Sequence, residues 1–149
     1  MSERNELEKV PGLMVPGLLP AARYPLTAGY WIAADEGRLV IQRCTECGTH
    51  RHPPAPACYR CQSFQWDWHQ VSGAGQIFSY TWVHAALTQA FVATVPYNVC
   101  VVELADTDGV RIASTVTGVN EGDDLIGSRV QGYFADAGGG NKLLLFAGA

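Results

Sequence analysis

Four of the five cysteines in this chain lie within one stretch of 18 residues, CTECGTHRHPPAPACYRC. They form two C-x-x-C pairs, Cys44/Cys47 and Cys58/Cys61, with ten residues between the pairs. Such a pair is typical of a tight knuckle that turns two sulfurs toward one point, and two facing knuckles supply four thiolates in a tetrahedron. The spacing therefore predicts a closed metal site with Cys44, Cys47, Cys58 and Cys61 as its ligands.

Zinc is the metal that we expect at this site. Four thiolates fill its tetrahedral coordination sphere, so no position remains for water or substrate and the metal should be structural. A segment this short buries too little apolar surface to fold without such a link. The ligand set alone does not separate zinc from iron, and a rubredoxin-like iron site would indicate electron transfer instead.

Two other roles for the cysteines are less consistent with the sequence. A redox C-x-x-C usually opens a helix, whereas PPAPA lies between these pairs and no helical pattern follows them. Disulfides are rare where thiols are kept reduced. The N-terminus, MSERNELEK, is charged, and the apolar run after it is short and interrupted by prolines, so we expect neither a signal peptide nor a membrane span. These features predict a cytoplasmic protein.

The remainder of the chain favours β-structure. From Gln65 onward, short runs rich in β-branched and aromatic residues alternate with Gly and Asp. If residues 65–83 form one strand that bends at Gly73 and Gly75, the count is five strands, which fits an OB-type barrel. An SH3-like barrel is the main alternative.

The sequence thus predicts a mainly β chain in four parts. Residues 1–25, which contain several prolines, are expected to form an extended arm. Residues 26–43 should form a short helix, capped by Thr27 and ended at Gly37, and a lead-in strand. Residues 44–64 should form a rubredoxin-like zinc ribbon, and residues 65–149 the five-stranded OB-fold barrel.

Side chains that often perform chemistry are present but not grouped into a catalytic motif. Cys100 lies among apolar residues and is expected to be a small buried side chain. Asp106 and Asp108 are expected in a hairpin turn. The histidines, which lie outside any recognised motif with a nucleophile, are His50, His52, His69 and His84. We therefore expect no catalytic residues in this chain.

The order of a Trp-bearing helix, a zinc ribbon and an OB-type barrel resembles the acyl-CoA-associated zinc-ribbon/OB-fold proteins, long classed as a domain of unknown function. One departure is Pro54-Ala55, where the family often has Pro-Arg, so no phosphate contact is carried over to this position. The segments that carry the resemblance are GYWIAADEGRLVIQRCTECG from Gly29, CYRC at Cys58, VSGAGQIFSYTWV from Val71, VPYNVCVVEL from Val95 and LIGSRVQGYF from Leu125.

The resemblance implies a noncatalytic subunit that binds a thiolase-superfamily or hydratase-like enzyme in a hetero-oligomer. The partner would be an acyltransferase or a retro-aldolase of steroid side chains, and this chain would help to enclose the CoA or acyl group. The CoA thioester would then be a ligand of the complex, not a cofactor of this chain alone. Exposed apolar patches mark interfaces, so Tyr30 and Trp31 are candidate partner contacts, with packing against the ribbon as the alternative.

A different function for an OB barrel is the binding of single-stranded nucleic acid. Bases could stack on the aromatic side chains of Trp66, Trp68, Tyr80 and Trp82. The formal net charge of −4 weighs against this function, as does a lysine content limited to Lys9 and Lys142. Tracking a phosphate backbone normally requires several cations.

Overall fold

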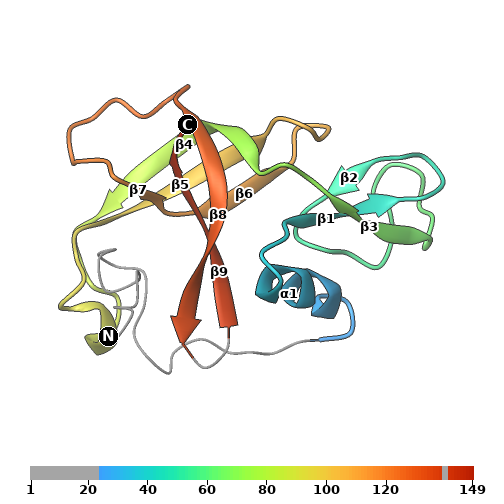
Figure 1. The fold of residues 1–149 in the computed structure, drawn as a ribbon, viewed down its shortest axis with the longest axis horizontal. Helices are drawn as coiled ribbons and strands as arrows, with labels where there is room; N and C mark the ends of the chain where they lie inside the picture. The colour runs from blue at the N-terminus through green and yellow to red at the C-terminus, as the bar shows by residue number, and fades with distance from the viewer. Residues whose placement is uncertain (1–23, 139–140) are drawn as a thin grey trace.

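The computed structural model describes residues 24–138 and 141–149. Within these residues, one α-helix accompanies a three-stranded sheet and a six-stranded sheet (Figure 1). The predicted N-terminal arm falls almost entirely outside the described residues. The elements are α1 (Ala28–Asp35), β1 (Val40–Cys44), β2 (His50–Arg51), β3 (Trp66–Gln70), β4 (Ala74–Val83), the 3₁₀ helix η2 (Gln89–Phe91), β5 (Tyr97–Leu104), β6 (Arg111–Ser114), β7 (Val116–Thr117), β8 (Arg129–Gly138) and β9 (Asn141–Gly148).

The predicted short helix is present, and its C-terminus is fixed by a glycine. Gly37 has a φ of 75°, a conformation that costs glycine little. Its N–H donates to the Ala34 carbonyl at 2.9 Å, and the Arg38 N–H donates to the Ala33 carbonyl at 2.8 Å. This pair of bonds is a Schellman motif, which satisfies carbonyls that the helix itself leaves unpaired. Thr27 occupies the N-cap position but makes no side-chain capping bond.

The smaller sheet contains the predicted lead-in strand. Its order is β2-β1-β3, and both pairings of β1 are antiparallel. β3 pairs with β1 from Val40↔Gln70 to Cys44↔Trp66. The prediction of one bent strand across residues 65–83 is therefore wrong. The chain leaves the smaller sheet after Gln70, turns through Gly73 and enters the larger sheet at Ala74, because β3 has its own partner in β1.

The larger sheet has the order β6-β5-β4-β8-β9-β7. Its pairings are antiparallel except for β7 with β9, which run parallel. β6 and β7 are separated only by Thr115, so one extended run of chain pairs with β5 through its first half and with β9 through its second. Counted in this way, the sheet is built from five runs, and the mainly β, OB-type fold class predicted from the sequence is confirmed.

Both sheets contribute to one hydrophobic core. β5 alternates half-buried and buried residues, as expected for a strand with one face on the core. Cys100 on this strand is fully buried, as predicted. Leu39 and Ile41, at the start of the smaller sheet, belong to the same buried cluster as Val102 and Phe146 of the larger sheet. The two sheets are thus held together by shared apolar packing.

Candidate functional site

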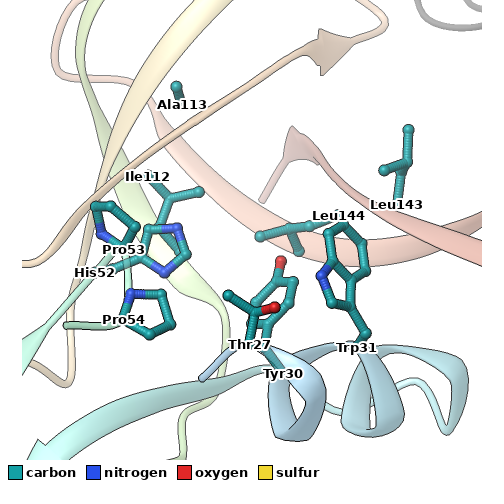
Figure 2. A pocket seen from close by; sticks show the side chains of 10 residues that line it. All are labelled: Thr27, Tyr30, Trp31, His52, Pro53, Pro54, Ile112, Ala113, Leu143 and Leu144. Atoms are coloured by element: carbon teal, nitrogen blue, oxygen red, sulfur yellow. The ribbon is translucent and has the colours of Figure 1, made fainter. Parts of the chain in front are cut away.

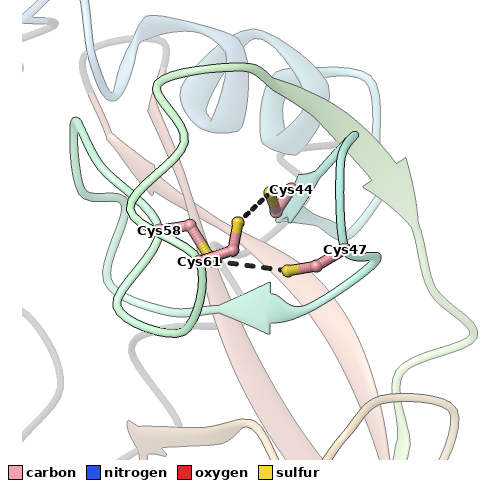
Figure 3. Close-up of side chains that lie close together, drawn as sticks. All are labelled: Cys44, Cys47, Cys58 and Cys61. Carbon is pink, nitrogen blue, oxygen red and sulfur yellow. Dashed lines mark hydrogen bonds between the residues drawn. The ribbon is translucent and has the colours of Figure 1, made fainter.

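The four cysteine sulfurs of the C-x-x-C pairs converge beside the smaller sheet (Figure 3). All four Sγ atoms lie within 4.8 Å of one another, and the Sγ atoms of Cys44/Cys61 and of Cys47/Cys58 are 3.6 Å apart. A zinc tetrahedron with bonds of 2.3 Å has sulfur–sulfur edges of about 3.8 Å. The four cysteines are free thiols rather than disulfides, and their number, chemistry and spacing fit zinc.

The two knuckles share the same backbone geometry. In the first, the Gly48 N–H donates to the Cys44 carbonyl at 2.9 Å; in the second, the Gln62 N–H donates to the Cys58 carbonyl at 2.8 Å. Gly48 and Gln62 occupy equivalent places and both have positive φ, 74° and 63°. Sequence reasoning could identify the need for Gly48, but nothing in the sequence marks Gln62 as the residue that bears the same conformation.

The surroundings of the sulfurs lower the pKa of Cys47 and of Cys58, whereas burial and the neighbouring cysteine side chains raise the pKa of Cys61 to about 12. The Cys47 Sγ lies 3.2 Å from the Thr49 Oγ1, and this side-chain bond, followed by one from the Thr49 backbone, lowers the pKa of Cys47 to about 6. At Cys58 the backbone N–H of Cys61 is the largest cause of a lowered pKa. The lowered pKa values of Cys47 and Cys58 match the need of a metal site for deprotonated sulfur.

The segment between the knuckles is held by a buried side chain, Gln42, that no sequence motif marks. Gln42 is completely buried in β1. Its Oε1 accepts hydrogen bonds from the Arg51 Nε at 2.6 Å and from the Ala55 N–H at 2.8 Å. Arg51 also donates to the Ala55 carbonyl at 3.1 Å. This network holds the proline-rich loop against the strand that carries the first cysteine.

Polar contacts from a turn of the larger sheet reach the ribbon and the segment after it. Asp106 and Asp108 lie in the turn between β5 and β6, as predicted. The Asp106 Oδ2 accepts from the Ser72 N–H at 2.7 Å, and the Asp108 Oδ2 accepts from the His50 N–H at 3.2 Å. The His50 bonds lower the pKa of Asp108. The two aspartates therefore help to fix the ribbon on the OB-type sheet.

A cavity of about 300 Å³ lies where the helix, the ribbon and the larger sheet meet (Figure 2). Tyr30 and Trp31 line it from α1, and Tyr30 also packs against the main core cluster. His52 and the two prolines after it line the cavity from the ribbon, and Leu144 is among the residues that line it from the larger sheet. The role of Tyr30 and Trp31 as partner contacts stays a prediction.

The aromatic residues considered for nucleic-acid binding lie on strands of two different sheets. Trp66 and Trp68 lie on β3 of the smaller sheet, whereas Tyr80 and Trp82 lie on β4 of the larger sheet. Trp68 is in close contact with Gly29 of the helix. These side chains are therefore divided between two sheets.

The histidines also stay apart from any nucleophile–base arrangement among the described residues. His50 contacts Asp108, and its ring lies 5.1 Å from that of His69. His84 pairs with Glu121 at 2.9 Å, on the exposed surface.

In the described part of the chain, no helix is long and apolar enough to cross a membrane.

Two family models match consecutive parts of this chain. The rubredoxin-like zinc ribbon domain of ChsH2 matches residues 31–67, and the C-terminal OB-fold domain of ChsH2 matches residues 68–135. The chain is also similar to a chain of the Ltp2-ChsH2(DUF35) aldolase, with a TM-score of 0.76 and 37% sequence identity. That match covers 87% of this chain and 98% of the aldolase chain.

Two curated relatives are hydratase subunits. A probable enoyl-CoA hydratase alpha subunit of Thermomonospora curvata is 45% identical over 91 residues, which cover 60% of this chain and 27% of that protein. The 3-oxo-4,17-pregnadiene-20-carboxyl-CoA hydratase alpha subunit of Mycobacterium tuberculosis is 33% identical over 110 residues, which cover 74% of this chain and 34% of that protein. The matches thus span about a quarter to a third of the length of these two relatives.

Proposed function

Since this chain belongs to the ChsH2 family of zinc-ribbon and OB-fold proteins, we propose that it is a noncatalytic subunit of an acyl-CoA enzyme complex. The similarity to the Ltp2-ChsH2(DUF35) aldolase chain carries the proposal, because it extends over 98% of that chain at 37% identity. The partner would be a thiolase-like enzyme, either an acyltransferase or a retro-aldolase of steroid side chains. A hydratase-like partner is the other choice that the relatives support.

In this proposal the chain contributes structure and the partner contributes the chemistry. Zinc bound by Cys44, Cys47, Cys58 and Cys61 would link the two knuckles of the ribbon, and four thiolates leave it no position for substrate. The ion would supply folding free energy to the ribbon.

Exposed apolar side chains on α1 and on the connection between β4 and β5 suit contact with another protein or a ligand. Ile32, which follows Tyr30 and Trp31 on α1, is 51% exposed. On the OB-type sheet, Leu87 is 90% exposed in the long connection between β4 and β5. We assign the α1 face to the partner interface, and we assign the β4–β5 connection to the enclosure of the CoA or acyl group, since OB folds use such loops for ligands.

The experiment is reconstitution with the thiolase-like enzyme that co-purifies with this chain from its native cell. Purified partner is assayed for acyl-CoA cleavage or transfer with and without this chain, and the melting temperature of the partner is measured in parallel. We expect this chain to raise the reaction rate of the partner at least tenfold, or to raise the melting temperature of the partner by several degrees. A partner that is fully active and equally stable alone contradicts the proposal.

A matched pair of variants tests the α1 face. Ile32→Glu should weaken assembly, because it places a charge in an apolar contact. Ile126→Glu is the control, since Ile126 is similarly exposed, at 56%, and lies in the turn before β8 rather than on α1. Equal assembly of both variants would exclude this face from the interface.

A further inference from the structure

The smaller sheet has an unpaired edge along β3. The strand order is β2-β1-β3, so β3 pairs with β1 on one side only (Figure 1). This pairing runs through all five residues of β3 without a bulge, and the strand, WDWHQ, contains neither lysine nor proline. Lysine, proline and bulges are the usual means by which a protein protects a free edge from another strand. The edge of β3 can therefore accept a further strand.

The backbone groups of alternate residues point away from β1. At the two ends of β3, the Thr45 N–H donates to the Gln65 carbonyl at 3.2 Å, and the Val71 N–H donates to the Leu39 carbonyl at 3.0 Å. Because the direction of these groups alternates along a strand, the odd-numbered residues of β3 bond to β1 and the even-numbered residues face outward. None of the described residues forms a hydrogen bond with the outward N–H and C=O groups, which belong to Trp66, Trp68 and Gln70.

A second copy of β3 has the complementary pattern. Two identical edges related by a two-fold axis pair in the antiparallel sense, and each hydrogen-bonded pair must join outward-facing residues. An axis at Trp68 meets this condition and pairs all five residues, with Trp66 opposite Gln70 of the second copy. The same register places Asp67 of each copy opposite His69 of the other, in a position where side chains lie close together.

Other symmetric registers are less favourable. An axis at Asp67 would place two carboxylates directly opposite each other, and like charges in this position are destabilising. An axis at His69 would place two imidazoles opposite each other and leave Asp67 outside the paired segment. The side-chain chemistry of the strand thus favours the register that is centred on Trp68.

The Asp67 carboxylate has capacity for a partner across the edge. Its side chain is 41% exposed. Arg43 on β1 donates to the Asp67 Oδ1 at 3.1 Å and to the Oδ2 at 2.7 Å. A carboxylate offers about four acceptor sites, so two remain for other donors. An imidazole carries a ring N–H in either protonation state, so His69 of a second copy can donate to Asp67.

The edge is held in position before any association. The Arg43–Asp67 ion pair joins β3 to β1, and the Trp68 indole ring is in close contact with Gly29 of α1. A strand fixed in this way loses little conformational freedom when it pairs. From these observations we propose that two copies of this chain associate through antiparallel pairing of their β3 strands, centred on Trp68. The association goes beyond the proposed function and does not depend on the identity of a partner enzyme.

Sedimentation equilibrium of the full-length zinc-loaded protein measures the association. An interface built on a five-residue strand is small, so we expect a reversible dimer with a dissociation constant of roughly 10–200 µM. A chain that remains monomeric up to about 1 mM overturns the proposal.

Amide hydrogen exchange identifies the surface that pairs. Exchange at the outward amides of Trp66, Trp68 and Gln70 should be at least threefold slower in concentrated than in dilute solution, because these amides gain partners in the dimer. The amides of Asp67 and His69 already face β1 and should change less than twofold. A dimer in which the outward amides show no such slowing would contradict pairing through β3.

A pair of charge variants tests the register. His69→Glu places like charges opposite each other and should weaken dimerisation about tenfold, whereas His69→Lys keeps an opposite charge facing Asp67 and should weaken it less than threefold. His84→Glu is the matched control, because it makes the same substitution at an exposed histidine outside the smaller sheet, and it should change the affinity less than twofold. Equal affinities of the two His69 variants would overturn the register.

A proline variant tests the backbone pairing. Gln70→Pro removes an outward N–H without removing a bond to β1, and it should weaken dimerisation about tenfold. Full dimerisation of this variant would exclude the edge from the interface. The exchange pattern of the unaltered protein gives the same test without a substitution, so the proposal stays open to refutation if a variant does not fold.

Discussion

The Asp108 carboxylate, in a turn of the OB-type sheet, lies 3.2 Å from both the backbone nitrogen and the Nδ1 of His50 in the zinc ribbon. Fifty-eight residues separate the two positions in the chain. The contact joins the two β-modules at a point where the ribbon carries only the two-residue strand β2. Together with the shared apolar core, it gives the ribbon a defined orientation on the larger sheet.

Asp108→Asn should loosen this junction. The carboxylate accepts charge-assisted bonds that an amide accepts less strongly, but the side chain is largely exposed, so we expect a loss of only about 0.5–1 kcal/mol of unfolding free energy. Urea unfolding at pH 7 measures it. Asp124→Asn, in an exposed loop, is the control and should cost less. Equal losses of unfolding free energy in the two variants would show that the contact between Asp108 and His50 does not stabilise the fold.

The same carboxylate predicts a pH effect of defined sign. The folded-state pKa of Asp108 is lowered, so its stabilisation is complete above the unfolded pKa of about 4 and is lost as pH falls through the folded value. The difference in unfolding free energy between wild type and Asp108→Asn should therefore shrink below pH 4. A difference that stays constant from pH 7 to pH 3 would contradict this assignment.

Metal removal should unfold the ribbon. Cys44→Ser removes one of the four converging sulfurs, and we expect loss of bound zinc, loss of dispersed NMR signals from residues 44–64, and poor solubility. Cys100→Ala is the control, because Cys100 is buried in the larger sheet and its loss should leave the metal content at one ion per chain. A coloured, iron-containing preparation would indicate a rubredoxin-like centre instead.

Gln62→Gly should stabilise the second knuckle. Gln62 has a φ of 63°, which costs a residue with a Cβ roughly 1 kcal/mol, so glycine should add about 0.5–1 kcal/mol to the unfolding free energy of the zinc-loaded protein. Gly48→Ala, at the equivalent position of the first knuckle, should destabilise by a similar amount. Thermal unfolding of both variants tests the pair, and changes of the same sign would refute the equivalence of the knuckles.

Gly29→Ala should separate the helix from the ribbon sheet. A Cβ at this position would overlap the Trp68 indole ring at Nε1, Cε2 and Cδ1, so the helix or the tryptophan must move. Overpacking of this kind costs about 1–3 kcal/mol. The double variant Gly29→Ala/Trp68→Leu should recover part of the loss in a double-mutant cycle of unfolding free energies. Additive effects would mean that the two residues do not act through contact.

Alkaline pH should test the burial of Tyr30. Its folded pKa is raised to about 12 while the unfolded pKa is about 10, so stability is complete below pH 10 and is lost as pH rises toward 12. We expect a loss of about 2 kcal/mol over this interval, absent from Tyr30→Phe. Unfolding curves at pH 9 and pH 11.5 measure it. Identical pH dependence in both proteins would place the phenol in solvent.

Local patterns were enough to predict several features correctly. The spacing of the cysteine pairs indicated that four sulfurs would converge, because each C-x-x-C closes on itself within a few residues. Gly37 marked the end of the helix for an equally local reason, its tolerance of positive φ. Short runs of β-branched and aromatic residues, separated by Gly and Asp, indicated the strands, and the mainly β, OB-type fold followed from their number and spacing.

Long-range pairing was not predictable from the same patterns. β3 looks like part of the barrel, yet it pairs with β1, more than twenty residues earlier in the chain, because a strand pattern shows which residues face inward but not which strand lies beside it. The left-handed conformation of Gln62 carries no signal in its residue type. The Gln42 network around the proline loop depends on a partner, Arg51, that the strands bring alongside it.

By itself, the sequence determined the metal-binding chemistry, the β-rich fold and the family, because these depend on residue types at short spacing. Only the tertiary structure decided that Asp108 meets His50, and that Tyr30, Trp31 and His52 surround one uncharged cavity. Those outcomes depend on how the helix, the ribbon and the larger sheet pack together, and packing is set by the complementary shapes of whole surfaces rather than by any local run of residues.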